Sequence, residues 1–399
     1  MDILFVRDLF RPIDFGGNRY PWEVTRRLSR DHRVRVVTAR FAGPLPGTTD
    51  ADIHHYSASL RTPLETFFTN ALFSRIEVEK RIRARRPDVI VLSSYDVAFG
   101  HFALARHADI PTVYIYHSSF YSPAIDRVRS KPWPLRSVHG SLDAFTTWVE
   151  ALTFRNASAV VAVSPFSKRE IEHRLGRPDP RVRVIPTGVD AAFFSPGDRS
   201  EARARLGLPL ERTILLSVGR MVPVKRYDRA IEAVHLLRRE DPAYMLILAG
   251  TGPEERRLSQ LASERSEERA VQFAGFTDGE RLRDLYRAAD IVLCTSDFEN
   301  WSLAVLEALS TGTPVIGTPG GSIPDLLGLV DPSLIAPGTD PVEIAATVRA
   351  HLASGRREEI SQAAREQISA AYTWDQTVEG LLACFRDVIV SARTSGARE

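Results

Sequence analysis

The stretch 296–314 reads Ser-Asp-Phe-Glu-Asn-Trp-Ser-Leu-Ala-Val-Leu-Glu-Ala-Leu-Ser-Thr-Gly-Thr-Pro, and Gly-Gly-Ser-Ile-Pro follows at 320–324. An apolar run at 291–294 precedes it and predicts a strand. We expect a helix that begins near Asn300 and ends at Gly312, because a glycine followed shortly by a proline is typical of a helix end. Apolar residues cover every side of this helix, which is typical of a buried one.

Glu307 stands in the middle of this apolar helix. Glutamate is almost never fully buried without a partner. Glu299 lies just before the helix, beside the positive end of the helix dipole. Either the helix is partly exposed and Glu307 is solvated, or Glu307 borders a polar cleft and holds a ligand hydroxyl. The rest of the chain favours the second alternative.

The bulk composition describes a globular protein with two domains. Its 399 residues exceed what one hydrophobic core usually serves. An apolar content of 44% with 26% charged residues is ordinary, and a net charge of +2 gives no general case for nucleic acid. Cys294 and Cys384 lie in apolar surroundings without metal-ligand spacing, so we expect buried free thiols and no disulfide framework.

The N-terminus enters an apolar strand at once and lacks the basic region and cleavage site of a signal peptide. No apolar run approaches the roughly 20 residues that a membrane-spanning helix needs. We therefore expect a cytoplasmic protein. An irregular, proline-containing loop suits anionic headgroups at the inner face of the membrane, or a phosphate-bearing acceptor. Its basic and aromatic residues are Arg127, Arg129, Lys131, Trp133 and Arg136.

Strands and helices alternate from the start of the chain. A strand at 3–6, a loop with Gly16 and Gly17, a helix near 20–29 and a strand at 34–38 predict a βαβ unit. Glycines at such a strand end let the backbone approach a ligand, although a plain tight turn is the alternative. The Gly-x-Gly-x-x-Gly fingerprint is absent, which disfavours a dehydrogenase.

His117 follows another expected strand, at 112–116, where a histidine can meet a ligand. After the charged stretch 196–205, which we interpret as an inter-domain linker, the alternation restarts. The sequence thus predicts an α/β fold of two Rossmann-like domains, residues 1–195 and 196–372, that face each other across a cleft. A final helix over 374–390 is expected to pack back onto the first domain.

Arg220 and Lys225 follow the strand expected at 214–218, in a loop that enters a helix. Arginine supplies a fork, lysine a point charge and the helix a dipole, so the loop suits phosphates; surface cations are the alternative. The next strands end in the glycine turns 250–253 and 275–277. Several such loops in one domain favour a nucleotide.

A set of motifs occurs in order: Val218-Gly-Arg220 with Lys225, Ala249-Gly-Thr-Gly-Pro253, Tyr286-Arg-Ala-Ala-Asp290, Glu299 to Glu307, and Gly312-Thr-Pro-Val315. The set resembles the retaining, nucleotide-sugar-dependent glycosyltransferases of the GT-B fold, often called family four. The Gly16-Gly17 loop, Val163–Lys168 and Ile185–Asp190 are similar to that family's N-terminal landmarks. The resemblance spans nearly the whole chain.

The resemblance implies a first domain on the acceptor side and a second domain that holds a UDP- or GDP-linked sugar. Arg220 and Lys225 would neutralise the diphosphate, Glu307 would hold the ribose and Glu299 a hydroxyl of the donor sugar. His117 would face the sugar, and no metal or other cofactor is implied. The implied catalytic residues are His117, Arg220, Lys225 and Glu299, and the implied donor-binding residues are Gly16, Gly17, Phe276, Thr277, Asn300, Trp301, Ser302, Leu303 and Glu307.

Where many family members have Gly-Phe-Gly, this chain has Asn300-Trp301-Ser302, and we expect its sugar preference to lie there. Asp50-Ala-Asp52, with two histidines nearby, imitates the metal motif of another glycosyltransferase fold but precedes an expected edge strand far from the phosphate loop. Two alternatives stay open: a catalytically silent sugar-nucleotide-binding protein and a hydrolysing sugar-nucleotide epimerase. The acceptor stays open among a glycolipid, a polysaccharide and a small molecule.

Overall fold

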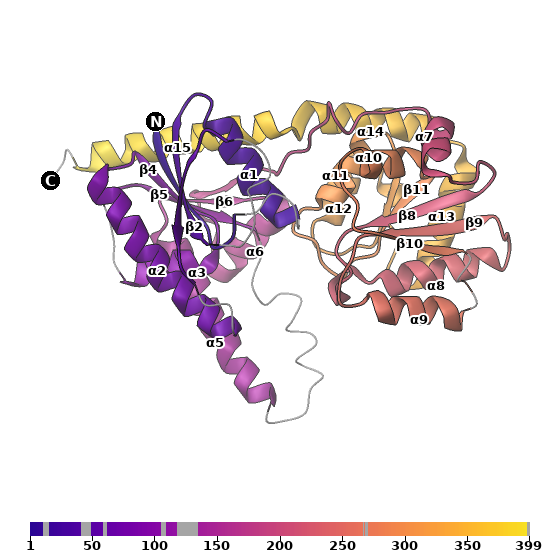
Figure 1. Cartoon of the computed structure of the whole chain (residues 1–399), viewed down its shortest axis with the longest axis horizontal. Coiled ribbons are helices and arrows are strands. Elements are labelled where there is room, and N and C mark those ends of the chain that lie inside the picture. The colour runs from indigo at the N-terminus through magenta and orange to yellow at the C-terminus, as the bar shows by residue number, and fades with distance from the viewer. Residues whose placement is uncertain are drawn as a thin grey trace. The chain divides into compact units, whose positions relative to one another are not determined.

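The chain folds into two compact units (Figure 1). The computed structural model describes residues 1–10, 16–40, 49–58, 62–104, 109–117, 135–265, 267 and 270–396. Unit 1 comprises Met1–Pro186 and Trp374–Glu399, and unit 2 comprises Thr187–Thr373. Each unit is built on a parallel sheet, so the predicted α/β class is confirmed.

Unit 1 contains a seven-stranded sheet in the order β3-β2-β1-β4-β5-β6-β7. Its strands are β1 (Asp2–Val6), β2 (Arg33–Ala39), β3 (Asp52–Tyr56), β4 (Val89–Leu92), β5 (Thr112–Tyr116), β6 (Ala159–Ala162) and β7 (Val182–Val184). All pairings are parallel, and the central strands are buried along their whole length. Burial on both faces is why these strands appear in the sequence as continuous apolar runs.

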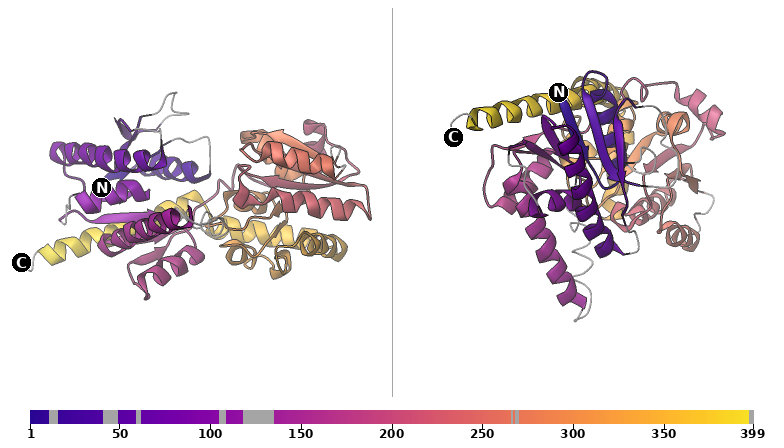
Figure 2. Two further views of the ribbon diagram at one scale, coloured as in Figure 1. Left: turned by 90° about the horizontal axis from the view of Figure 1, so that it is seen from below. Right: turned by 60° about the vertical axis from the view of Figure 1, so that its left-hand side comes forward.

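The helices of unit 1 are α1 (Gly16–Leu28), α2 (Pro63–Ala84), α3 (Tyr95–Leu104), α5 (Leu135–Asn156), α6 (Pro165–Leu175) and α15 (Trp374–Gly396). The sequence analysis placed Gly16 and Gly17 in the loop before this helix. In the structure they are instead the first two residues of helix α1. The last helix, α15 (yellow in Figures 1 and 2), belongs to unit 1. Its Asp375 accepts a hydrogen bond from Arg27 of α1 at 3.0 Å, which ties the end of the chain to its beginning.

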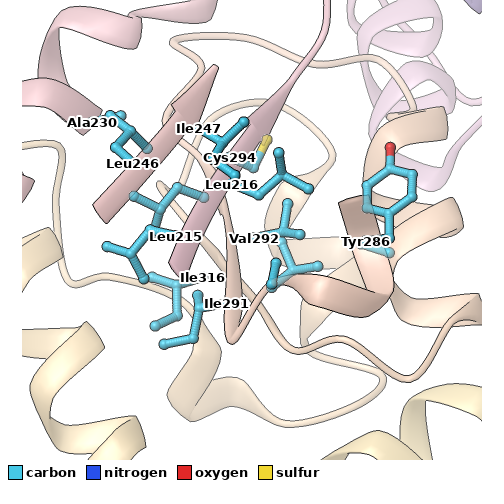
Figure 3. Close-up of a cluster of buried hydrophobic side chains, with 14 of the residues drawn as sticks. Leu215, Leu216, Ala230, Leu246, Ile247, Tyr286, Ile291, Val292, Cys294 and Ile316 are labelled. Carbon is cyan, nitrogen blue, oxygen red and sulfur yellow. The ribbon is translucent and has the colours of Figure 1, made fainter. Parts of the chain in front are cut away.

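Unit 2 contains a five-stranded parallel sheet in the order β10-β9-β8-β11-β12. Its strands are β8 (Thr213–Val218), β9 (Tyr244–Ala249), β10 (Val271–Gly275), β11 (Ile291–Cys294) and β12 (Val315–Gly317). Its helices are α7 (Arg199–Leu206), α8 (Tyr227–Arg238), α9 (Glu255–Glu264), α10 (Gly279–Ala288), α11 (Leu303–Ser310), α12 (Ile323–Leu327), α13 (Pro341–Ser354) and α14 (Arg357–Ala371), with 3-10 turns η1 (Pro223–Lys225) and η2 (Pro332–Leu334). Figure 3 shows its core, where Leu215, Ile247 and Val292 of neighbouring strands interlock and are almost fully buried.

The predicted linker at 196–205 is wrong, because most of it forms helix α7 inside unit 2. Asp198 caps this helix, and the buried guanidinium of Arg203 donates to Asp290 at 2.7 Å. Arg203 also donates to the carbonyl oxygen of Ala288 at 3.0 Å. The dense charge of this stretch therefore reflects arginines paired with distant carboxylates, and not a solvated connection.

Replacing Arg203 by methionine should lower the free energy of unfolding by about 3 kcal/mol, because it leaves the largely buried Asp290 without its main cation. Arg199→Met is the matched control. Arg199 pairs with the same carboxylate from the same helix, but its side chain is 46% exposed, against 4% for Arg203. The control should cost less than about 1 kcal/mol. Equal losses in urea unfolding would contradict this interpretation.

Candidate functional site

Three glycines end neighbouring strands of unit 2 and bring their loops close together. Gly219, Gly250 and Gly275 have φ values of 139°, 139° and 68°. The amide of Gly219 donates to the carbonyl of Ala249 at 2.9 Å, and that of Gly250 donates to Gly275 at 2.7 Å. A Cβ on Gly250 would lie 2.0 Å from the carbonyl oxygen of Gly219, so no side chain fits there. The carboxyl ends of β8, β9 and β10 thus form one edge lined by backbone, where ligands of such sheets bind.

Lys225 and Glu299 meet at this edge. Lys225 ends the 3-10 turn after β8, and Glu299 lies in the loop after β11. The ammonium nitrogen of Lys225 donates to Oε1 of Glu299 at 2.5 Å. The same oxygen accepts a hydrogen bond from Ser296 at 2.7 Å. A cation and a carboxylate from neighbouring strands are therefore held side by side.

Backbone contacts hold the two loops in register. The amide of Asp297 donates to the carbonyl oxygen of Val224 at 2.8 Å. The hydroxyl of Thr295 donates to the carbonyl oxygen of Arg226 at 2.9 Å. These bonds fix the relative position of the loops independently of the ion pair.

The charge of Lys225 is maintained by its surroundings. Burial, the largest single effect, lowers the pKa of its ammonium, whereas the charge of Glu299 and the hydrogen bond to it raise the pKa, and the net shift is upward. Arg220, exposed in the same loop, lies close enough to oppose this effect. Burial, together with the charge of Glu299, raises the pKa of the neighbouring Cys294 thiol to about 12. Lys225 is thus a cation and Cys294 a neutral thiol, and the predicted free, buried state of Cys294 and Cys384 is confirmed.

The turn Gly320–Ser322 packs against the backbone of the loop that contains Glu299. The amide of Ser322 donates to the carbonyl oxygen of Glu299 at 2.8 Å. A Cβ on Gly321 would lie 2.2 Å from that oxygen, and one on Gly320 would lie 2.6 Å from the carbonyl oxygen of Ser296. Both glycines are needed because backbone packs directly on backbone here.

Glu307 is buried in α11, with only 5% of its surface exposed, so the solvated alternative is excluded. Its Oε2 accepts a hydrogen bond from the hydroxyl of Tyr286 in α10 at 2.9 Å. Tyr286, labelled in Figure 3, is the partner that the apolar helix pattern could not reveal. The contact of Glu307 with a ribose stays a prediction.

Helix α11 begins at Leu303, later than predicted, so Asn300, Trp301 and Ser302 precede it. Asn300 and Ser302 are buried. The indole of Trp301 donates to the carbonyl oxygen of Thr187 at 3.0 Å, and its ring packs against Tyr372. Trp301 therefore anchors the loop to the start and end of unit 2.

On the β10 side of the same edge, the hydroxyl of Thr277 donates to the carbonyl oxygen of Gly275 at 3.1 Å. The neighbouring Phe276 is exposed. A narrow pocket, with room for little more than a water molecule, lies between the ends of β8 and β11 and the start of α11. Its lining includes the polar residues Lys225, Tyr227, Thr295, Ser296, Glu299 and Ser302.

In unit 1, His117 belongs to a polar cluster at the ends of β5, β4 and β1. Its Nε2 lies 2.9 Å from the hydroxyl of Ser93, to which Arg7 donates at 3.1 Å. Its ring packs edge-on against Tyr20 of α1, with 4.7 Å between ring centroids. Burial and, secondly, Arg7 hold the pKa of His117 well below 6.5, so the ring is neutral. Arg7 and Ser93 were missed in the sequence, although Arg7 directly follows a predicted strand, as His117 does.

Several predicted features lie outside the candidate site. Arg127, Arg129, Lys131 and Trp133 lie outside the described residues, as does the side chain of Arg136. Within the described ranges, no three His, Cys, Asp or Glu residues gather in a way that could hold a metal ion. Nor does any helix in that part of the chain have the length and apolar character needed to cross a membrane.

Comparison with known proteins identifies the family. A model described as Glycosyl transferases group 1 matches residues 198–367, and one described as Glycosyltransferase Family 4 matches residues 16–193. A D-inositol 3-phosphate glycosyltransferase of Geodermatophilus obscurus is 31% identical over 93% of this chain and 85% of its own length. The chain belongs to the group 1, family 4 glycosyltransferases.

A second curated relative and two solved structures are also similar to this glycosyltransferase. A D-inositol 3-phosphate glycosyltransferase of Salinispora arenicola is 33% identical, covering 95% of this chain and 88% of its own. Sucrose-phosphate synthase from Thermosynechococcus elongatus superposes with a TM-score of 0.81 at 22% identity, over 98% of this chain and 100% of its own. Anabaena HepE in complex with UDP superposes with a TM-score of 0.72 at 19% identity, over 97% of this chain and 100% of its own. These neighbours confirm the predicted GT-B fold.

Lowering the pH tests the neutral state of His117 in this glycosyltransferase. The pKa of His117 is lower in the folded protein than its value of about 6.5 in the unfolded chain. As the pH falls below 6.5, His117 therefore gains a proton in the unfolded chain before it does so in the folded protein. The free energy of unfolding should therefore fall by up to ~1.4 kcal/mol per pH unit through this residue. Urea titrations between pH 7.5 and 5 should show a shallower dependence for His117→Gln.

His173→Gln is the matched control, since His173 is exposed on α6. It should keep the wild-type pH dependence. An unchanged slope in His117→Gln would contradict the buried, neutral state of His117.

Proposed function

We propose that this glycosyltransferase moves a hexose from a nucleoside diphosphate sugar to an acceptor, with retention of the anomeric configuration and without a metal or other cofactor. The observation that carries the proposal is the 2.5 Å ion pair of Lys225 and Glu299 at the carboxyl edge of the unit 2 sheet. A cation suited to a departing diphosphate stands there beside a carboxylate suited to a sugar hydroxyl.

Lys225 and Arg220 supply the positive charge. Charge develops on the diphosphate as the bond to the sugar breaks, and preorganised cations stabilise that charge without reorganising. Arg220 is exposed and offers a planar fork, whereas Lys225 is a point charge held by Glu299. The two cations would perform the task that a metal ion performs in other phosphate-transferring sites.

Glu299 is better suited to binding than to acid or base chemistry. In the described part of the chain, its hydrogen bonds from Lys225 and Ser296 both go to Oε1, so Oε2 is available to a sugar hydroxyl. Both hydrogen bonds orient the carboxylate as an acceptor, which suits it to holding a substrate hydroxyl. This pairing weakens the case for a glycosidase-like pair with Glu307.

Glu307 and the β10 loop would bind the nucleoside. Tyr286 orients the carboxylate of Glu307 for ribose hydroxyls, and the backbone of Phe276 and Thr277 would meet the base. HepE has been solved with UDP and with UDP-glucose, and starch synthase IV with ADP. We propose a UDP- or GDP-linked donor, with Gly16 and Gly17 as further donor-binding residues and with His117 facing the sugar.

Incubation with a panel of UDP-, GDP-, ADP- and dTDP-sugars tests the reaction, and the readout is release of the nucleoside diphosphate. D-inositol 3-phosphate heads the acceptor panel because the relatives carry its name, and a glycolipid and a polysaccharide primer complete it. We expect acceptor-dependent release with one donor, unaffected by EDTA, and a product that keeps the donor's anomeric configuration. Tight nucleotide binding without release would support a catalytically silent protein, and release of an epimerised free sugar would support the epimerase.

Two single variants separate binding from turnover. Glu307→Ala should raise the Kd for the nucleoside diphosphate about tenfold or more, because hydrogen bonds to a charged group are lost. Glu299→Ala should leave that Kd within about threefold, because backbone hydrogen bonds hold the Lys225 loop in place without the ion pair, and should lower kcat about 100-fold, since Glu299 would contact the reacting sugar. Glu240→Ala, on a remote exposed ion pair with Arg349, is the control. Near-wild-type behaviour of both site variants would defeat these assignments.

A further inference from the structure

The hydroxyl of Tyr227 is a buried polar group with no role in the reaction described above. Tyr227 is the first residue of α8 and only 5% exposed. Among the described residues its Oη has no hydrogen-bond partner. A buried hydroxyl without a partner costs stability, so its presence needs an explanation.

The hydroxyl lies where the proposed diphosphate would bind. Tyr227 lines the same narrow pocket as Lys225 and Glu299. A Cβ built on Gly219 would lie 3.1 Å from Oη of Tyr227 and 4.0 Å from Nζ of Lys225. The phenol and the ammonium therefore converge on one point above the carboxyl end of β8, which is open because residue 219 has no side chain.

An unusual backbone conformation produces this convergence. Arg226, between the two residues, has a φ of 49°, and in the described part of the chain it alone has a positive φ without being a glycine. Its guanidinium is held by Asp228 at 3.0 Å and by Asp297 at 3.4 Å. Such a conformation persists only when its surroundings enforce it, and it is found often at functional sites.

Tyr227 can act there only as a neutral phenol. Burial and, secondly, the charge of Glu299 raise its pKa well above 10. A phenolic hydrogen thus lies beside the Lys225 cation. Two donors that converge on one point match an oxygen acceptor with negative charge.

We propose that Tyr227 binds the donor substrate, its hydroxyl donating a hydrogen bond to a phosphoryl oxygen of the diphosphate that Lys225 neutralises. This inference rests on the proposed function and adds a residue to its donor site. The ring of Tyr227 packs in the hydrophobic core of unit 2, so the hydroxyl is held in place before the ligand arrives. The ligand would then supply the hydrogen-bond partner that no described residue supplies.

Calorimetric titration of Tyr227→Phe tests the inference, because phenylalanine keeps the ring and removes only the hydroxyl. The wild type is first titrated with UDP, GDP, ADP and dTDP, and the diphosphate that binds most tightly is used thereafter. Tyr227→Phe should bind this diphosphate about tenfold more weakly, the loss expected for one hydrogen bond to a charged group. Its affinity for the matching nucleoside, measured by competition, should be unchanged.

The thermal stability of the ligand-free variant supplies a second readout. Since Tyr227→Phe removes a buried hydroxyl that no described residue satisfies, its Tm should equal or exceed that of the wild type. Tyr244→Phe is the matched control, since Tyr244 begins β9 at the opposite end of the sheet. It should keep the wild-type affinity for the diphosphate.

Other outcomes would overturn the inference. Equal affinity of the wild type and Tyr227→Phe for the nucleoside diphosphate would do so. A lower Tm of the variant, together with equal losses of affinity for the nucleoside diphosphate and the nucleoside, would also do so, because it would indicate a structural role. A loss seen only with the sugar nucleotide would move the contact to the sugar and reject the phosphoryl assignment. If the wild type bound none of the four diphosphates, the proposed function would fail together with this inference.

Discussion

The ion pair between Lys225 and Glu299 is the interaction on which the candidate site depends. Both side chains are largely buried, at 23% and 11% exposure, and a buried charge persists only with a partner. The pair connects the loops that follow β8 and β11, which are neighbours in the sheet. It therefore fixes side by side the cation that we propose for the diphosphate and the carboxylate that we propose for a sugar hydroxyl, which is how preorganised sites avoid the cost of rearrangement.

Close backbone packing is the second constraint. Gly219 and Gly250 approach so closely that a side chain on the second would collide with the carbonyl of the first, and Gly321 packs in the same way on Glu299. Because Gly250 and Gly321 leave no room for a side chain, backbone packs directly on backbone in these loops. The absence of a side chain at residue 219 lets Lys225 and Tyr227 reach one point above it. Fold and site thus share one cause, the close approach of adjacent strand ends.

Much of this arrangement could be predicted from sequence, and the failures have physical reasons. Strands β5 and β11 lie at their predicted bounds, because strands buried on both faces are plain apolar runs. The segment α7 was mistaken for a linker, since the carboxylates that pair with its arginines lie far away in sequence. The contact of Tyr286 with Glu307 could not be inferred either, because helical periodicity shows that a residue is buried but not what it touches. Residues that follow the ends of strands could be chosen as site candidates from the sequence. The residues that they contact could be identified only from the structure.

Hydrogen–deuterium exchange with and without the donor tests the central claim most directly, namely that the strand-end loops of unit 2 hold the sugar nucleotide. The measurement uses the full chain with the sugar nucleotide that binds most tightly. The account predicts protection concentrated in four segments: 219–227, 250–253, 275–278 and 296–303. Saturating binding that leaves these segments unprotected, while other parts of the chain are protected, would contradict it.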